Sequence, residues 1–311
     1  MKRLLSILLS CLLLITGAVG LTACGGEKNI TVVAREQGSG TREAFDKAVS
    51  DGNGSFLEMK VDGKKVYKTT SNADIQKETG NVMSKVASDK NAIGYISLGS
   101  VNDTIKVVKI NGVAPTSESV LDGSYKIQRP FVIMTSSTVE LTDIAKDFLL
   151  YLKSDASETH ASEAGCIYLA DETKRANEGE AGIPVAEYEV KASLPAGGKI
   201  TVNGSTSMEK FIKKAMSAYA SLYGRTADEL FTLDLQGSSV GKTAVQNDKN
   251  GNVIGLSSAS VKEDGISSFN VCLDAVAVIV NKDNEGVDDL TVAQLYDIFS
   301  GKVTKFSEIV G

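Results

Sequence analysis

The sequence predicts an α/β fold built as two domains. Short β-rich runs alternate with segments of helical periodicity along most of the chain, which is typical of α/β layers and not of a sandwich or a bundle. The 311 residues are 42% hydrophobic and 23% charged, which indicates a soluble globular body long enough for roughly two domains of ordinary size. After the N-terminal apolar run, no segment is apolar for long enough to span a bilayer.

The strands and helices can be placed in order along the chain. The expected strands are residues 30–34, 92–98, 106–110, 129–135, 199–204, 231–236 and 274–281, all β-rich runs. Helical spacing is clearest at Phe45, Ala48 and Val49, at Phe148, Leu149 and Leu152, at Met208, Phe211, Ile212, Ala215 and Tyr219, and at Leu290, Leu295, Ile298 and Phe299. The glycine- and proline-rich stretch 177–199 is expected to be a linker or a surface loop, and the glycine-rich stretch 51–63 a loop that can include a hairpin.

The chain begins with a predicted lipoprotein signal peptide, residues 1–23. Lys2 and Arg3 precede an apolar run, 4–21, which leads into Thr-Ala before Cys24. Small residues flank the cysteine, and serines and glycines interrupt the run, which favours a cleaved signal over an uncleaved membrane helix. We therefore expect a lipid on the sulfur of Cys24 and a mature protein anchored to the extracytoplasmic face of the cell membrane.

The predicted mature chain is acidic. The whole chain has a net charge of −6, and removal of the signal peptide takes away two positive charges and no acid. This balance excludes a nucleic-acid partner and gives no long-range attraction to an anion. If the protein binds an anion, local donors must do it.

Three small polar clusters stand where an expected strand gives way to an expected helix. They are Arg-Glu-Gln-Gly-Ser-Gly-Thr at 35–41, Gly-Ser-Thr-Ser at 204–207 and Gly-Ser-Ser-Val-Gly at 237–241. The first N–H groups of a helix have no internal partner and the helix dipole is positive there, so an anion is favoured. Glycine lets the backbone approach a ligand, and Ser or Thr adds a hydroxyl donor. Arg35 supplies the charge that a desolvated oxyanion requires.

Each cluster also has a purely structural interpretation, because Ser, Thr and Gly are the usual N-cap residues. For Arg35 the corresponding alternative is a surface salt bridge with Glu36 or Glu43. Three such clusters in one chain, one of them with an arginine four residues before the serine, favour an oxyanion site.

Together these segments resemble PstS-type phosphate-binding proteins of ABC importers, in the periplasmic-binding-protein superfamily. ITVVAREQGSGTREAF and AIGYISLGS resemble the second half of that family. ITVNGSTSMEKF, LQGSSVGKTAV, VIGLSSASV, DAVAVIVN and LTVAQLYDIFSGKVTKFSEIVG resemble its first half. The halves are therefore in circularly permuted order here, with the new joint in the linker at 195–198. Domain termini commonly lie close together, so such an order is physically tolerable.

The resemblance implies a two-lobed, type II periplasmic-binding-protein-like α/β fold, circularly permuted, with a ligand cleft between the lobes. One lobe would combine residues 29–108 and 278–311 and carry the Arg35 cluster, and the other would be 109–277. YKIQRPFVIMT and DAVAVIVN would cross between the lobes as hinge strands.

The resemblance also implies which residues bind phosphate. They are Arg35, Ser39, Gly40 and Thr41 from one lobe and Thr206, Ser207, Ser238 and Ser258 from the other, with Ser239 a near alternative to Ser238. Some members of the family have an aspartate in place of Ser258, where the carboxylate accepts a phosphate proton. Serine at that position leaves selectivity against sulfate open.

The function implied by the resemblance is capture of inorganic phosphate for the membrane permease subunits of an ABC importer. The lobes would close on the anion, and the protein is expected to be a monomer without a cofactor, a metal or an enzymatic activity. The alternatives are a binding lipoprotein for another oxyanion, and a sensor or adhesin without a role in transport.

Two enzyme classes match the third cluster less well. Residues 237–243 resemble a nucleotide-binding P-loop, but Gln236 stands where that pattern requires glycine. Residues 237–241 fit the G-x-S-x-G of a serine hydrolase, and Ser239 begins an S-x-x-K, yet the only histidine, His160, lies upstream. His160 lies in a polar helical stretch and is expected at the surface.

Two cysteines remain once Cys11 and Cys24 are assigned to the signal peptide and the lipid. For Cys166 and Cys272, a disulfide and a pair of buried free thiols are equally compatible with the sequence.

Overall fold

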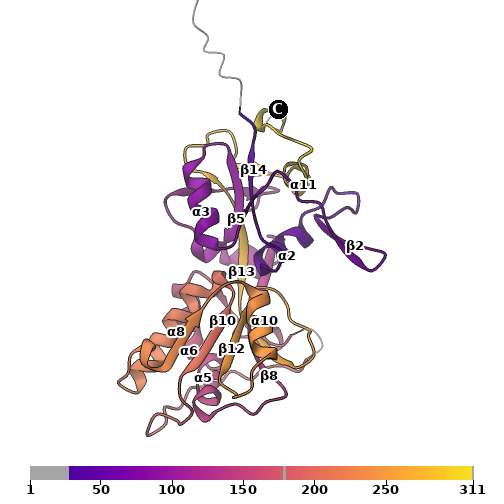
Figure 1. The fold of residues 1–311 in the computed structure, drawn as a ribbon. Coiled ribbons are helices and arrows are strands. Elements are labelled where there is room, and N and C mark those ends of the chain that lie inside the picture. Colours follow the sequence, from indigo (N-terminus) through magenta and orange to yellow (C-terminus); the bar gives the residue numbers. More distant parts are fainter. Residues whose placement is uncertain (1–27, 178–179, 310–311) are drawn as a thin grey trace, which may run out of the picture.

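Two α/β lobes are stacked along one long strand, β13 (Ile266–Asn281), as Figure 1 shows. The computed structural model describes residues 28–177 and 180–309, so the predictions for residues 1–23 and for Cys24 lie outside the described residues. The alternation of strands and helices confirms the predicted α/β class. Within the described part of the chain, no helix combines the length and the apolar character needed to cross a membrane.

The elements have the following bounds. The other strands are β1 (Thr31–Arg35), β2 (Glu58–Val61), β3 (Lys64–Tyr67), β4 (Asp74–Gln76), β5 (Ala92–Ser97), β6 (Ile105–Val107), β7 (Lys109–Ile110), β8 (Gln128–Ser136), β9 (Ile167–Tyr168), β10 (Ile200–Gly204), β11 (Phe231–Asp234), β12 (Val253–Ser257) and β14 (Asp289–Leu290). The helices are α2 (Gly40–Ala48), α3 (Thr79–Ser88), α4 (Ser117–Leu121), α5 (Asp143–Lys153), α6 (Ala156–Glu163), α7 (Glu172–Arg175), α8 (Glu209–Leu222), α9 (Ala227–Leu230), α10 (Ser238–Gln246) and α11 (Val292–Ser300). Short 3-10 turns are η1 (Leu98–Ser100), η2 (Thr206–Met208) and η3 (Phe306–Glu308).

One mixed sheet runs through both lobes in the order β11-β10-β12-β8-β13-β5-β1-β4. At one end β10 is parallel to β11 and β12, and at the other β1 is parallel to β4 and β5. The pairs between them are antiparallel. β13 pairs with β8 through residues 266–275 and with β5 through residues 276–280. A single strand therefore belongs to both lobes.

The lobe that carries Arg35, here called the Arg35 lobe, has an aromatic core. Phe45 of α2 stacks on Tyr95 of β5 with ring centroids 4.0 Å apart. Phe299 of α11 lies 4.7 Å from Phe45, and all three side chains are fully buried. Burial of each such ring is worth about 1.5–3 kcal/mol, so the packing joins the early and the late parts of the chain.

The other lobe, here called the Ser238 lobe, has its own aromatic core. Phe148 of α5 lies 5.0 Å from Tyr219 of α8 and 4.7 Å from Phe231 of β11, measured between ring centroids. The apolar residues that recur with helical spacing in the sequences of α5 and α8 thus form the faces that these helices bury against the sheet.

The boundary between the lobes differs from the predicted one. Val120, Tyr125 and Ile127 are buried in the core of the Arg35 lobe, although the sequence placed them in the other lobe, 109–277. Because these side chains are buried there, the chain passes from the Arg35 lobe to the Ser238 lobe at β8 and not near Val108. It returns within β13, where Ala275 already packs in the Arg35 lobe. The Ser238 lobe is therefore one continuous stretch between the two crossings.

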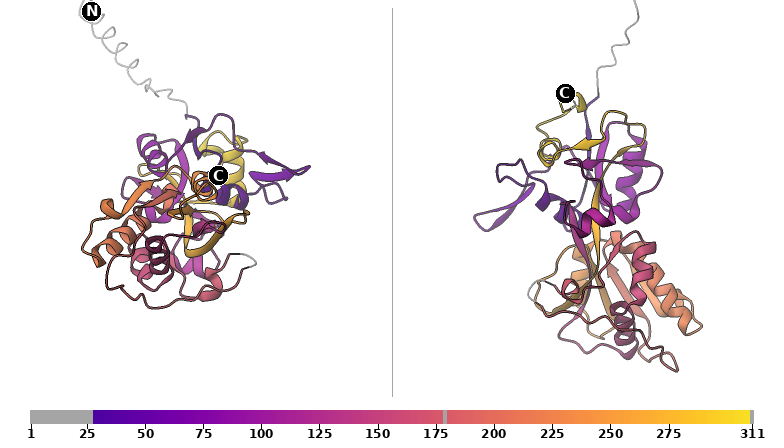
Figure 2. Two further views of the ribbon diagram at one scale, coloured as in Figure 1. Left: turned by 60° about the horizontal axis from the view of Figure 1, so that its bottom comes forward. Right: turned by 180° about the vertical axis from the view of Figure 1, so that it is seen from behind.

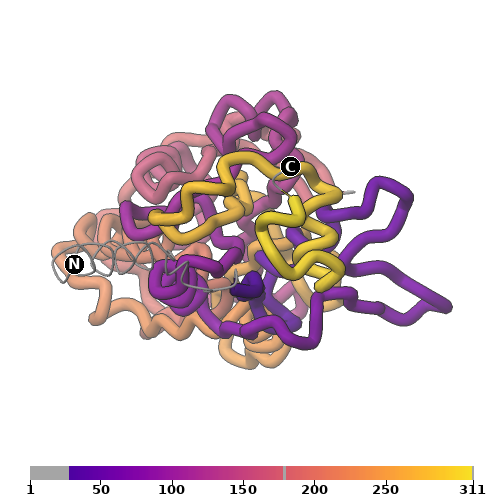
Figure 3. Tube along the Cα trace, turned by 90° about the horizontal axis from the view of Figure 1, so that it is seen from above, coloured from indigo at the N-terminus to yellow at the C-terminus, as the bar shows by residue number. Residues whose placement is uncertain are grey.

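The two ends of the described chain lie side by side. The backbone N–H of Ile30 donates to the carbonyl of Thr304 at 2.7 Å, and the views in Figure 2 show the segment that follows α11 beside the start of β1. Figure 3 looks down on the same lobe and shows the β2–β3 hairpin standing out to one side.

His160 is buried, so the prediction of a surface position was wrong. Its Nε2 lies 2.7 Å from the hydroxyl of Tyr151, because α6 packs against α5 and α8 despite its polar sequence. Burial lowers the pKa of His160, which favours the neutral imidazole. Cys166 and Cys272 are both buried free thiols in this lobe.

Candidate functional site

The Arg35 cluster forms the turn between β1 and α2. Gly38 has φ +110°, a conformation that glycine adopts without strain. The Ser39 hydroxyl caps the helix by accepting from the backbone N–H of Arg42 at 3.4 Å. The N–H groups of Gly40 and Thr41 then stand at the open end of α2, where a helix has no acceptor of its own to offer.

The second and third clusters lie at one edge of the sheet in the Ser238 lobe. β10 and β12 are parallel neighbours, so Ser205, which follows β10, lies beside Ser258, which follows β12. The Ser205 hydroxyl donates to that of Ser258 at 2.9 Å. α10 begins at Ser238, directly after Gly237 with φ +117°, and the Ser238 and Ser258 hydroxyl oxygens are 3.3 Å apart.

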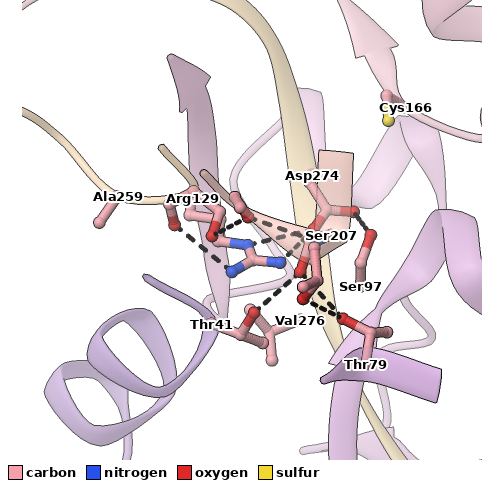
Figure 4. A network of polar contacts seen from close by, with 12 residues as sticks. Thr41, Thr79, Ser97, Arg129, Cys166, Ser207, Ala259, Asp274 and Val276 are labelled. Atoms are coloured by element: carbon pink, nitrogen blue, oxygen red, sulfur yellow. Dashed lines mark hydrogen bonds and ion pairs between the residues drawn. The ribbon is translucent and has the colours of Figure 1, made fainter. Parts of the chain in front are cut away.

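The three clusters meet where the lobes touch. Thr41 Oγ1 of the Arg35 lobe lies 3.0 Å from Ser207 Oγ of the Ser238 lobe, as Figure 4 shows. A Cβ atom on Gly40 would lie within 2.7 Å of the hydroxyl oxygens of both Ser238 and Ser258. The expected site residues that are brought together and buried here are Arg35, Ser39, Gly40, Thr41, Thr206, Ser207, Ser238 and Ser258.

Thr79 is part of the same cluster, and the sequence analysis missed it. It is the first residue of α3, and its Oγ1 lies 3.2 Å from Thr206 Oγ1 and 3.4 Å from Ser207 Oγ. A threonine just before the apolar spacing of Val82 and Val86 was a local sign of a helix start. Its partners Thr206 and Ser207 are more than a hundred residues away, so that sign does not place it in the site.

Arg35 is buried at the edge of this cluster with 2% of its surface exposed. Its Nη1 donates to Thr79 at 3.4 Å, and its Nη2 donates to the carbonyl of Lys77 at 2.6 Å. The guanidinium also makes a two-point pair with the Glu36 carboxylate at 3.1 and 3.3 Å. The salt bridge considered from the sequence is therefore present, but it is mostly buried and lies next to the hydroxyl cluster.

A second buried arginine, Arg129 of β8, adjoins the cluster and was also missed. Its Nε and Nη2 donate to Asp274 of β13 at 3.1 and 2.9 Å, and its Nη1 donates to the carbonyl of Ser258 at 3.4 Å. The other carboxylate oxygen of Asp274 accepts from Ser97 at 2.9 Å (Figure 4). Burial raises the pKa of Asp274 and lowers the pKa of Arg129, while their mutual attraction opposes both shifts.

The structure separates Ser238 from its near alternative, Ser239. Ser238 is buried among the hydroxyls, whereas Ser239 is exposed, and its backbone N–H donates across the lobes to Gly38 at 3.2 Å. Neither serine has histidine beside it, because His160 is bonded to Tyr151 in the core of the lobe. Among the described residues, no group of three or more His, Cys, Asp and Glu side chains could hold a metal.

The arrangement has the chemistry of an anion-binding site. It gathers the N-termini of α2, α3 and α10 and neutral hydroxyl donors from both lobes beside the buried guanidinium groups of Arg35 and Arg129. Such donors stabilise negative charge in a dry site without supplying a nucleophile and base pair.

Known proteins match this chain over most of its length. The family model described as "PBP superfamily domain" matches residues 23–156 and 189–311. "Phosphate-binding protein PstS 2" of Streptococcus pneumoniae serotype 4 is 35% identical over 304 residues, which are 93% of this chain and 94% of that protein. The crystal structure of a phosphate-binding protein of a phosphate ABC transporter from S. pneumoniae TIGR4 matches with a TM-score of 0.63 and 34% identity, over 90% of this chain and 99% of that one. "Phosphate-binding protein PstS" of Bacillus subtilis strain 168 is 31% identical over 150 residues, only 47% of this chain and 44% of that protein.

Proposed function

This chain belongs to the PBP superfamily and, within it, to the family of phosphate-binding PstS proteins, and we propose that it captures inorganic phosphate outside the cytoplasm for the permease of an ABC importer. That family consists of solute-binding proteins and not of enzymes. The observation that carries the proposal is the meeting of helix N-termini and hydroxyls from both lobes beside the buried Arg35.

The proposed phosphate contacts come from both sides of the cleft. The residues expected from the sequence are Arg35, Ser39, Gly40 and Thr41 on the Arg35 lobe, and Thr206, Ser207, Ser238 and Ser258 on the Ser238 lobe. Thr79 of α3 is added to those on the Arg35 lobe. Because the donors are divided between the lobes, the anion is bound fully only when the lobes are together. Capture by closure follows.

In this proposal, the free energy of binding comes from replacing hydrogen bonds between hydroxyls by hydrogen bonds from the same hydroxyls to the anion. The Ser207 hydroxyl oxygen lies 3.0 Å from that of Thr41 and 3.4 Å from that of Thr79, and hydroxyls rotate freely enough to turn toward an anion. A hydrogen bond to a charged acceptor is worth about 1.5–3 kcal/mol, compared with about 1 kcal/mol for a neutral pair. A few such exchanges suffice for tight binding, while Glu36 holds the Arg35 guanidinium in position.

We also propose that the mature protein is a monomer held at the membrane by lipid on Cys24. The Thr-Ala-Cys sequence after the apolar run supports the lipid, and Lys28, the first described residue, is four residue steps along the chain from Cys24. A chain spans at most about 3.6 Å per residue, so the Arg35 lobe would stay within about 14 Å of the bilayer. Metabolic labelling with palmitate tests this: Cys24→Ala should lose the label and release the protein.

The order of segments is a further part of the proposal: it is permuted relative to the B. subtilis relative. The alignment with that protein covers less than half of each chain, as expected when only one half can align in one direction. The S. pneumoniae relative aligns from end to end and so shares the order found here. The contact between Ile30 and Thr304 makes the connection of the two ends short. A variant rejoined at those ends and opened at 195–198 should fold and bind phosphate.

Calorimetric titration tests the central proposal. Phosphate, and sulfate in parallel, are titrated into the mature protein after bound ligand has been removed by reversible unfolding. One-to-one phosphate binding is expected. A folded sample that binds sulfate but not phosphate would instead establish another oxyanion as the ligand, and one that binds neither would favour a sensor or adhesin.

A further inference from the structure

The lobes touch at a second place, outside the hydroxyl cluster. The η1 turn of the Arg35 lobe meets the end of α6 in the Ser238 lobe through backbone atoms alone. A Cβ atom on Gly99 would come within 2.1 Å of the Ala164 carbonyl oxygen, and a Cβ atom on Gly165 would come within 2.9 Å of the Gly99 Cα. Real Cβ atoms do not approach other atoms so closely, so this contact has no room for any side chain.

A charged hydrogen bond closes over the same contact. Lys210 Nζ donates to the Gly99 carbonyl across the lobes. Lys210 lies in the first turn of α8, which continues directly from the η2 turn that carries Thr206 and Ser207. The segment that presents hydroxyls to the oxyanion site therefore also holds the second contact.

The other side of the contact is fixed to the hinge strands. The η1 turn follows Ser97, whose hydroxyl donates to Asp274 of β13. Asp274 is paired with Arg129 of β8, which donates to the carbonyl of Ser258. A continuous chain of polar contacts thus connects the Gly99 turn, both crossing strands and the oxyanion site.

We propose that Gly99, Gly165 and Lys210 are positioning residues for ligand capture, which act by stabilising the closed arrangement of the lobes from outside the oxyanion site. The inference rests on the proposed capture by closure. Any fall in the population of the closed form lowers the apparent affinity in the same proportion. The contact residues therefore set affinity without touching the anion.

Two variants and two matched controls test the inference. Gly99→Ala places a methyl group into the Ala164 carbonyl, and Lys210→Met removes the cross-lobe donor while keeping the aliphatic stem. Gly286→Ala is the control for the glycine change, because no atom lies within 4 Å of its Cβ position. Lys213→Met is the control for the lysine change, since Lys213 lies on the same helix and pairs within its own lobe with Glu209.

Phosphate titration gives the first readout. Gly99→Ala should bind phosphate about tenfold or more weakly, and Lys210→Met about threefold or more weakly, by the population argument. Both controls should match the unmodified protein, and thermal unfolding should show all samples folded. Unchanged affinity in both Gly99→Ala and Lys210→Met would overturn the inference. Lys210→Met keeps the test valid if the glycine variant does not fold.

The distance between the lobes gives a second readout that does not depend on the ligand. Spin labels on cysteines introduced at Lys90 and Ser221, one exposed position in each lobe, report it in pulsed dipolar spectra; Cys166 and Cys272 are buried. Longer distances in both variants than in their controls, with or without phosphate, would support the contact. Identical distributions would overturn it. A protein that binds no phosphate would refute the proposed function, while the ligand-free distances would still decide the inference.

Discussion

Replacement of Gly40 by alanine should hinder closure of the lobes without lowering the stability of the fold. Gly40 is the first residue of α2, and its backbone is not in the left-handed region. Alanine there is compatible with the helix and should leave stability unchanged or raise it by up to about 1 kcal/mol. With the lobes together, however, the new methyl group would lie 2.5 Å from Ser258 Oγ and 2.7 Å from Ser238 Oγ. Both oxygens belong to the opposite lobe, so the clash exists only on closure.

The size of the effect follows from the cost of overpacking. An extra methyl group in a well-packed interior typically costs 1–3 kcal/mol, which corresponds to a loss of about 5- to 150-fold in affinity. Calorimetric titration with phosphate measures that loss, and urea unfolding measures stability. Gly286→Ala, in open space on the same lobe, is the control and should leave affinity unchanged. A Gly40→Ala protein that is stable and binds phosphate as tightly as the unmodified one would refute the assignment of Gly40 to the closing surface.

Three further outcomes are expected. Arg35→Ala should weaken phosphate binding far more than Lys242→Ala in parallel titrations, because loss of a buried cation leaves its partners uncompensated, whereas Lys242 of α10 pairs with Glu263 away from the hydroxyl cluster. Equal losses would remove Arg35 from the site. Thr79→Val, which keeps the shape and deletes the hydroxyl, should weaken phosphate binding about tenfold in the same assay, the value of one bond to a charged acceptor. Asp46 of α2 is buried, and its carboxylate lies 3.0 Å from the Arg42 guanidinium. Burial raises the pKa of Asp46 to about 6, although the Arg42 guanidinium opposes the shift. The protonated carboxyl group therefore contributes stability that is complete below about pH 4 and is lost as pH rises through 6. In urea unfolding, the free energy of unfolding of the unmodified protein should fall by up to about 3 kcal/mol over this range, and that of Asp46→Asn should not show this fall.

Local chemistry explains which parts of the site could be predicted. Capping and glycine conformation are decided within a few residues, so the clusters around Ser39, Ser205 and Ser238 are visible in the sequence as strand-to-helix junctions. The contacts that complete the site are of a different kind. Thr79 meets Thr206 across 127 residues of chain, and Arg129 finds Asp274 across 145. No local pattern encodes such pairings, so both Thr79 and Arg129 were missed.

The wrong predictions have the same origin in tertiary packing. The neighbours of His160 in the sequence are polar, yet α6 packs against α5 and α8, and Tyr151 of α5 gives the imidazole a buried partner. The boundary between the lobes was expected near Val108. Because Tyr125 and Ile127 are buried in the core of the Arg35 lobe, that lobe extends along the chain to the start of β8. In both cases burial depends on which surfaces the fold brings together, and periodicity alone does not report that.

The balance of charge explains why geometry must decide affinity in this cleft. Each buried guanidinium beside the hydroxyls already has a carboxylate partner, Arg35 with Glu36 and Arg129 with Asp274. The cleft therefore gains little net positive charge, and the whole chain is acidic. Long-range attraction cannot then supply the selectivity for an anion. Neutral donors must do so, and they are effective only at hydrogen-bond distance. Tight packing at Gly40 is what allows the two lobes to bring them that close.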